Sequence, residues 1–119
     1  MIVTIDYDFK TLNQYIEAER TNKFIAAKFK QEDTEAARLM VLDKQKITGY
    51  PILVAFTWFR KDERTDPDNI AFATKFILDG FVKGGLLEGD GWKYINGISN
   101  TFRKASWNYV AVEITVGRN

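Results

Sequence analysis

The stretch Ile52-Leu53-Val54-Ala55-Phe56-Thr57-Trp58-Phe59 decides the fold, because it is apolar on both faces of an extended chain. A strand of this kind is expected in the centre of a sheet, covered on both sides. A turn at residues 48–51 precedes it, and a charged loop at residues 60–65 follows. The remaining elements are therefore expected to assemble around residues 52–59.

Three further strands and two helical regions are expected around this central strand. The strands are predicted at residues 2–7, 93–98 and 109–116, where apolar side chains alternate. Residues 11–15 are expected to form a loop or a first helical turn. Residues 17–44 lack Gly and Pro and favour helix, which residues 21–22 and 32–34 could interrupt. A second helix is predicted from Asp68 or Asn69 to Lys83, where Gly84-Gly85 ends it.

The order β-α-β-α-β-β predicts an α/β (α+β) fold, a single domain over residues 1–119 with a mixed four-stranded sheet packed against helices. Two helical stripes are predicted to be buried. They consist of Ala36, Ala37, Met40 and Val41 in the first region, and of Ile70, Ala73, Ile77 and Phe81 in the second.

Composition excludes several kinds of site. The chain has no Cys and no His, which excludes disulfides, thiolate or the usual zinc sites, and Ser-His-Asp or Cys-His catalysis. No apolar run reaches the length of a membrane span, and the first residues do not resemble a signal peptide. We therefore expect a cytoplasmic protein with no membrane partner.

Net charge of +1 does not by itself predict a nucleic-acid partner. Basic residues nevertheless cluster in two places where acids are scarce. These are Arg20, Lys23, Lys28 and Lys30, and then Lys93, Arg103, Lys104 and Arg118. Taken alone, each cluster is typical of a solvated surface, but a basic face beside an acidic pocket is the other interpretation.

Asp66-Pro67-Asp68-Asn69 is the strongest candidate for a chemical site. Pro67 holds two carboxylates at a rigid separation, and a divalent cation would relieve their repulsion. We expect Asp66, Asp68 and Asp90 to converge on a hard cation. The alternatives are that the motif only caps a helix, that Lys75 and Asp79 form a surface pair four residues apart, and that Asp90 is a turn residue.

The combination of these segments resembles the RusA family of Holliday-junction resolvases, and most closely the RusA-like proteins of phages and prophages. The segments are Leu12-Asn13-Gln14-Tyr15, Arg64-x-Asp66-Pro67-Asp68-Asn69, Lys75-x-x-x-Asp79 and Gly89-Asp90-Gly91-Trp92-Lys93-Tyr94-Ile95. The spacing of six from Asn69 to Lys75 is three longer than in the best-known cellular member. Glu88-Gly89-Asp90 stands where that member has adjacent aspartates.

The resemblance implies a homodimeric Mg²⁺-dependent endodeoxyribonuclease that nicks four-way DNA junctions, with Mn²⁺ as a substitute and no nucleotide cofactor. A bacterial host and a phage or prophage gene are implied as well. Asp66, Asp68 and Asp90 would be metal ligands, Lys75 the catalytic cation, and Asn69 and Asp79 supporting residues. DNA contacts would come from Asn13, Arg20, Arg60, Lys61, Arg64, Lys93, Arg103 and Lys104.

Two other functions stay open at this point. One is a catalytically inactive DNA-binding or assembly protein of the same fold, and the other is a Mg²⁺ phosphoesterase on another nucleic-acid substrate. The large aromatics also bear on assembly, because one small core is not expected to enclose them all. Some are predicted in a homodimer interface, among Trp58, Phe59, Phe72, Phe76, Phe81, Trp92, Phe102 and Trp107.

Overall fold

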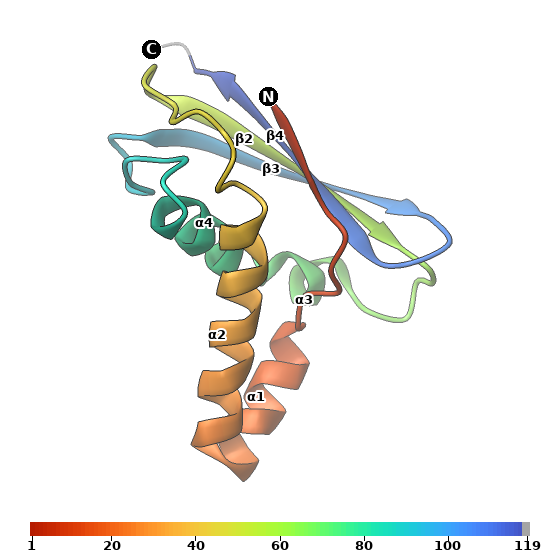
Figure 1. The fold of residues 1–119 in the computed structure, drawn as a ribbon. Helices are drawn as coiled ribbons and strands as arrows, with labels where there is room; N and C mark the ends of the chain where they lie inside the picture. The colour runs from red at the N-terminus through yellow and green to blue at the C-terminus, as the bar shows by residue number, and fades with distance from the viewer. Residues whose placement is uncertain (118–119) are drawn as a thin grey trace.

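A computed structural model describes residues 1–117 and contains a four-stranded sheet (Figure 1). The strands lie in the order β1 (Ile2–Ile5), β4 (Tyr109–Val116), β2 (Ile52–Arg60) and β3 (Ile95–Lys104). β2 is parallel to β3 and antiparallel to β4, which is in turn antiparallel to β1. The predicted mixed sheet and the central position of β2 are therefore confirmed. Arg118 lies outside the described residues.

β1 and β2 point in the same direction because β4 is antiparallel to both of them, and β3 shares this direction because it is parallel to β2. Their carboxyl ends therefore meet at one edge of the sheet, which we call the carboxyl edge. β4 begins at this edge, since Tyr109 pairs with Phe59. The amino ends of β2 and β3 lie at the opposite edge, where Ile52 pairs with Ile95.

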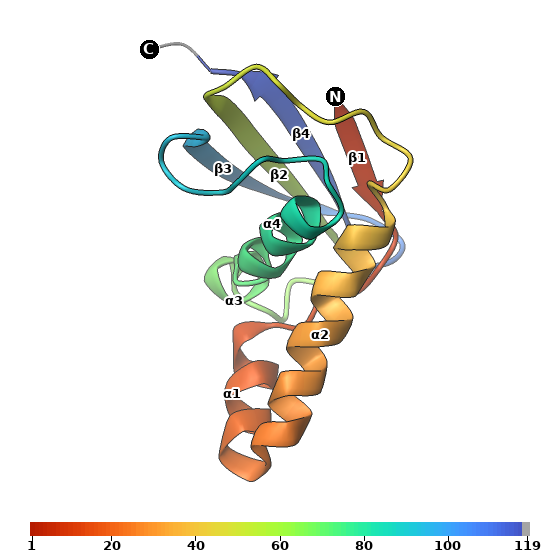
Figure 2. The same cartoon turned by 60° about the vertical axis from the view of Figure 1, so that its left-hand side comes forward.

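Four helices complete the described chain: α1 (Leu12–Thr21), α2 (Lys23–Leu39), α3 (Pro67–Ala71) and α4 (Thr74–Lys83). They lie on one side of the sheet, and α1 and the first half of α2 extend away from it (Figures 1 and 2). No helix of the described chain is both long enough and apolar enough to cross a membrane.

The core lies between the sheet and the helices. Alternate residues of β2 are buried there, namely Ile52, Val54, Phe56 and Trp58. The stripe predicted to be buried in the second helical region is buried there too, and it consists of Ile70, Ala73, Ile77 and Phe81. The other face of β2 is not covered, and Leu53 is 42% exposed. The expectation of a strand buried on both faces was wrong, because helices cover only one side of the sheet.

The first helical region divides at Asn22, as the sequence allowed. Asn22 ends α1 and also caps α2, because its side-chain oxygen accepts the Phe24 backbone N–H. No second break occurs at residues 32–34, and α2 ends at Leu39 instead of residue 44. α1 begins at Leu12, because Thr11 and Gln14 form a capping box that satisfies two backbone N–H groups. Of the two possibilities for residues 11–15, the first helical turn is therefore confirmed.

The second helical region is two helices and not one. At the junction of α3 and α4, the N–H of Ala73 bonds to the carbonyl of Ile70 and the N–H of Phe76 to that of Ala73, three residues back in each case. The predicted end at Gly84-Gly85 is confirmed. Leu86 and Gly85 donate to the carbonyls of Phe81 and Val82, and Gly85 has a φ of 85°, which glycine adopts without strain.

Helices α2 and α4 approach each other closely at Gly80. A Cβ atom on Gly80 would lie 2.5 Å from the backbone oxygen of Thr34 and 2.6 Å from Cβ of Ala37. Neither neighbour can move without shifting α2 as a whole. A glycine at this position therefore permits the contact between the two helices that cover the sheet.

We predict that Gly80→Ala lowers the free energy of unfolding by about 1–3 kcal/mol, because the added methyl overpacks the α2–α4 contact. Gly91→Ala is the matched control, since no atom lies within 4 Å of its Cβ position. Urea denaturation of both variants measures the difference. Equal stability of the two variants would show that α2 can move away from α4 at little cost.

Candidate nucleic-acid and metal site

Polar and charged side chains gather at the carboxyl edge of the sheet. Asp8 follows β1, Arg64 and Asp66 follow β2, and Arg103 and Lys104 end β3. Segments that are far apart in the sequence meet here because the three strands run in parallel. Ligand sites commonly form outside the carboxyl ends of strands in such sheets.

Two adjoining hollows open at this edge. The first, which we call the polar hollow, is lined by Asp8, Thr11, Asn13, Gln14, Arg60, Arg64, Thr65, Asp66 and Asn69. The backbone N–H of Asn13 donates to Oδ1 of Asn69 at 3.1 Å and joins α1 to α3 across this hollow. The sequence-predicted residues Asp66, Asn69, Asn13, Arg60 and Arg64 are therefore brought together.

The second hollow shares Arg60, Thr65 and Asp66 with the first. Arg103 and Lys104 add two further cations, while Pro67, Ile70 and Phe102 supply apolar lining. Asp62 and Glu63 also line it. Asp66 therefore stands where the two hollows meet, beside cations from β2 and β3.

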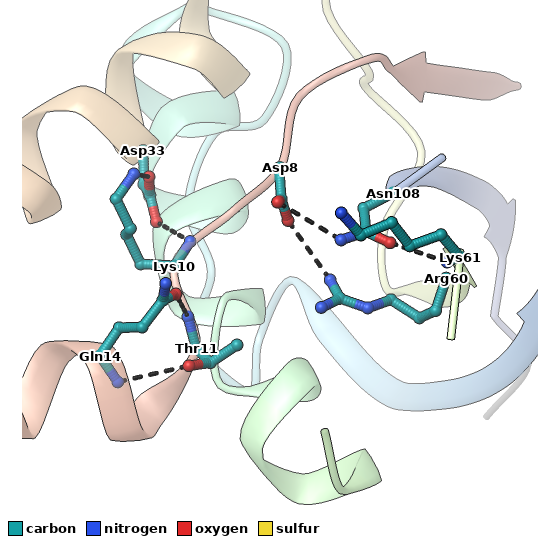
Figure 3. A network of polar contacts seen from close by, with 8 residues as sticks. All are labelled: Asp8, Lys10, Thr11, Gln14, Asp33, Arg60, Lys61 and Asn108. Carbon is teal, nitrogen blue, oxygen red and sulfur yellow. Dashed lines mark hydrogen bonds and ion pairs between the residues drawn. The ribbon is translucent and has the colours of Figure 1, made fainter. Parts of the chain in front are cut away.

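Asp8 connects the ends of three strands. Its carboxylate accepts from Nη1 of Arg60 at 3.4 Å and from Nδ2 of Asn108 at 3.3 Å (Figure 3). Oδ1 of Asn108 in turn accepts the backbone N–H of Lys61 at 2.8 Å. Asp8 was not predicted as a site residue from the sequence. Its place directly after an expected strand was the available signal, but nothing in the sequence indicated that β1 runs parallel to β2.

A buried carboxylate, Asp33 of α2, fixes the segment between β1 and α1 (Figure 3). The hydroxyl of Tyr7 donates to Oδ1 at 2.7 Å, and the backbone N–H of Lys10 donates to Oδ2 at 2.9 Å. Nζ of Lys10 lies 3.9 Å from Oδ1. Burial raises the pKa of Asp33, and the bonds from Tyr7 and Lys10 oppose that rise. Asp33 thereby holds the residues on both sides of Asp8.

Asp66 occupies the N-cap position of α3, but its carboxylate makes no capping hydrogen bond. Pro67 takes the first helical position, where a missing N–H costs nothing. Asp68 lies in the first turn and accepts the N–H of Asn69 at 3.0 Å. Both carboxylates are exposed, and Asp68 lies beside the hollows without lining either.

Lys75 and Asp79 form the surface pair that the spacing allowed. Nζ of Lys75 donates to Oδ1 of Asp79 at 3.1 Å, and the lysine side chain is 65% exposed. Lys75 is not among the residues that line the two hollows. In this arrangement its charge is directed to Asp79 rather than to Asp66.

Asp90 and Lys93 lie at the opposite edge of the sheet, in the loop before β3. β2 spans nine residues, which separates the two edges by about 25–30 Å. Among the described residues, no group of three acidic side chains is placed to hold a metal. The prediction that Asp90 converges with Asp66 and Asp68 was therefore wrong within one chain, because a crossover between parallel strands must end at the opposite edge.

Two more predicted DNA contacts lie away from the hollows. Arg20 is in the last turn of α1, and the exposed Lys61 follows β2.

The chain was compared with known protein families and with curated proteins, and neither comparison found a match.

The donor set at the carboxyl edge fits one kind of metal binding. Mg²⁺ is usually held by one or two carboxylates, several waters and substrate phosphates, and not by an all-protein cage. Asp66 and Asp68 supply two carboxylates near the amide of Asn69. A cage of three carboxylates does not fit, because Asp90 is remote.

We predict that Asp33→Ala lowers the free energy of unfolding by about 2–4 kcal/mol, because the Tyr7 hydroxyl and the Lys10 N–H both lose their partner. Glu35→Ala is the control on the same helix. Glu35 pairs with Arg38 at the surface, where ion pairs contribute little. Chemical denaturation compares the two, and an Asp33→Ala variant as stable as wild type would remove Asp33 as the anchor of this segment.

Proposed function

We propose that this protein is a Mg²⁺-dependent endodeoxyribonuclease that nicks four-way DNA junctions as a homodimer. The observation that carries the proposal is the position of Asp66 between two hollows that also contain Arg60, Arg64, Arg103 and Lys104. Carboxylates beside clustered cations suit a divalent metal next to a polyanion. The resemblance to RusA-like proteins supplies the junction as substrate and a cytoplasmic, phage- or prophage-encoded setting.

Each group at the carboxyl edge has a role in this proposal. Asp66 and Asp68 would hold the metal, which when bound supplies Lewis-acid stabilisation of the scissile phosphate. Arg60, Arg103 and Lys104 would bind neighbouring phosphates, which sets affinity without reading sequence. Asn69 would keep α1 beside the site through its bond to Asn13.

Exposed aromatics support the dimer. Trp92 is 93% exposed and Trp107 is 55% exposed, whereas Trp58, Phe76 and Phe81 are buried in the core. Large exposed aromatic side chains are typical of interface residues. Two copies would provide the two sites that paired nicks require.

A second candidate is a DNA-binding protein of the same fold without catalysis. The observations that favour it are the remote position of Asp90 and the pairing of Lys75 with Asp79. Two of the four residues assigned to catalysis thus lie away from Asp66. This candidate predicts junction binding through the same cations, with no Mg²⁺-dependent cleavage.

The first test is cleavage of a labelled four-way junction, with duplex, flap and mononucleotide substrates as comparisons. We expect Mg²⁺-dependent paired nicks from wild type, and activity at background for Asp66→Asn and for Asp68→Asn with junction binding retained. Asp90→Asn is the discriminating variant. Retained cleavage means that one chain builds the site, and lost cleavage means that the partner's loop contributes. Binding by wild type without cleavage in Mg²⁺ or Mn²⁺ would favour the second candidate.

The second test concerns Lys75. If its ammonium acts on the scissile phosphate in the transition state, Lys75→Ala should slow single-turnover cleavage by about a hundredfold, with little change in junction affinity. If the lysine only pairs with Asp79, the rate should be unchanged and the stability should fall by a few tenths of a kcal/mol, roughly the value of an i,i+4 pair. We expect the second result, because Lys75 pairs with Asp79 and lines neither hollow. A hundredfold slower rate would place Lys75 in the site.

A further inference from the structure

The α1–α2 hairpin forms an arm that extends away from the sheet. We define the arm as residues 12–32, that is, α1 and the first half of α2. The chain turns at Asn22, which lies at the end farthest from the sheet (Figures 1 and 2). Gly80 of α4 meets α2 at Thr34 and Ala37, which lie outside the arm. The arm therefore presents a tip that the rest of the described chain leaves uncovered.

The base of the arm is firmly attached beside the site. Tyr15 packs against Phe72 and Phe76, with ring centroids 5.5 and 6.0 Å apart. The bond from Asn13 to Asn69 adds a polar attachment to α3. The position of the tip is thus fixed relative to the polar hollow and does not depend on a flexible linker.

The tip combines an exposed aromatic ring with positive charge. Phe24, in the first turn of α2, is 81% exposed, and its backbone is held by the Asn22 cap. Residues 20–30 contain four cations, Arg20, Lys23, Lys28 and Lys30, and no acid. The acids of the arm, Glu17, Glu19 and Glu32, lie outside this stretch. A lone exposed apolar residue is ordinary, but one at a basic tip on a rigid arm is suited to a polyanion with apolar faces.

We propose that Phe24 stacks on the base pair at the branch point of junction DNA, while the cations of residues 20–30 bind the flanking phosphates. This inference rests on the proposed function for the choice of branched DNA. A base pair at a branch point is open to stacking by an inserted side chain, and apolar wedges among cations are a common way for proteins to deform DNA. A second copy of the tip is a poorer occupant, because its cations would repel these.

The test is the affinity of wild type and variants for a four-way junction and for a duplex of the same sequence, measured in Ca²⁺ so that cleavage does not interfere. Phe24→Ala should weaken junction binding by about tenfold or more, as expected for loss of one base–aromatic stack, and leave duplex binding unchanged. Phe24→Trp should restore junction binding. The variant should fold normally, because the ring is exposed. Leu42→Ala, which removes an exposed apolar side chain outside the arm, is the control.

A junction labelled with 2-aminopurine at the branch point reports the stacking directly. Its fluorescence should change when wild type binds and should not change with Phe24→Ala. Lys28→Gln should weaken both DNA forms equally and lower the salt dependence by about one phosphate contact. Unchanged junction affinity of Phe24→Ala, an equal loss for duplex, or loss of a dimer in sedimentation would each overturn the inference.

Failure of the inference can be distinguished from failure of the proposed function. If wild type cleaves the junction and Phe24→Ala binds it with full affinity, the proposed role of Phe24 is wrong and the proposed nuclease activity stands. If binding is selective for the junction and depends on Phe24 but no cleavage occurs in Mg²⁺, the proposed role of Phe24 stands and the proposed nuclease activity is wrong. Absence of any DNA binding by wild type overturns both.

Discussion

The hydrogen bonds to the buried Asp33 carboxylate are the interaction on which the site depends. They fix the segment from Tyr7 to Lys10 against α2, and this segment carries Asp8 to the ends of β2 and β4 and then starts α1. The cost of burying the carboxylate is offset only while both donors are present. The Asp33 side chain therefore fixes the position of the arm relative to the carboxyl edge.

The parallel pairing of β2 and β3 is the second constraint. The connection between two parallel strands must cross the length of the sheet, so α3 lies near one edge and the loop before β3 near the other. Asp66 and Asp90 are thus separated by the topology and not by any local preference. An assembly that brings Asp90 to Asp66 would need a second chain.

Much of the fold could be predicted from the sequence, because the signals are local. The alternation in β4, the buried stripe of Ile70, Ala73, Ile77 and Phe81, and the glycine end of α4 each depend on neighbours within a few residues. The errors arose where a distant partner decides. Leu53 looks as apolar as Val54, and only the absence of a helix on its side leaves it exposed.

The site was harder to predict for the same reason. Asp66, Asn69 and Asn13 were singled out by motif, and the fold brings them together. Asp8 was missed and Asp90 was placed wrongly, because strand direction decides which edge each one reaches. Asp8 and Asp90 are both carboxylates beside a turn, so their chemistry alone does not tell which edge of the sheet each one reaches.

The three tryptophans lie in different surroundings, which makes the chain its own optical reporter. Trp58 is buried and its indole N–H donates to Asn100 at 2.8 Å, whereas Trp92 and Trp107 face solvent at opposite edges of the sheet. A soluble quencher should reach the two exposed rings first and leave an emission dominated by the core. The emission that remains, from Trp58, would report on the packing of the sheet. The emission that is quenched, from Trp92 and Trp107, would report on any partner that covers the two edges.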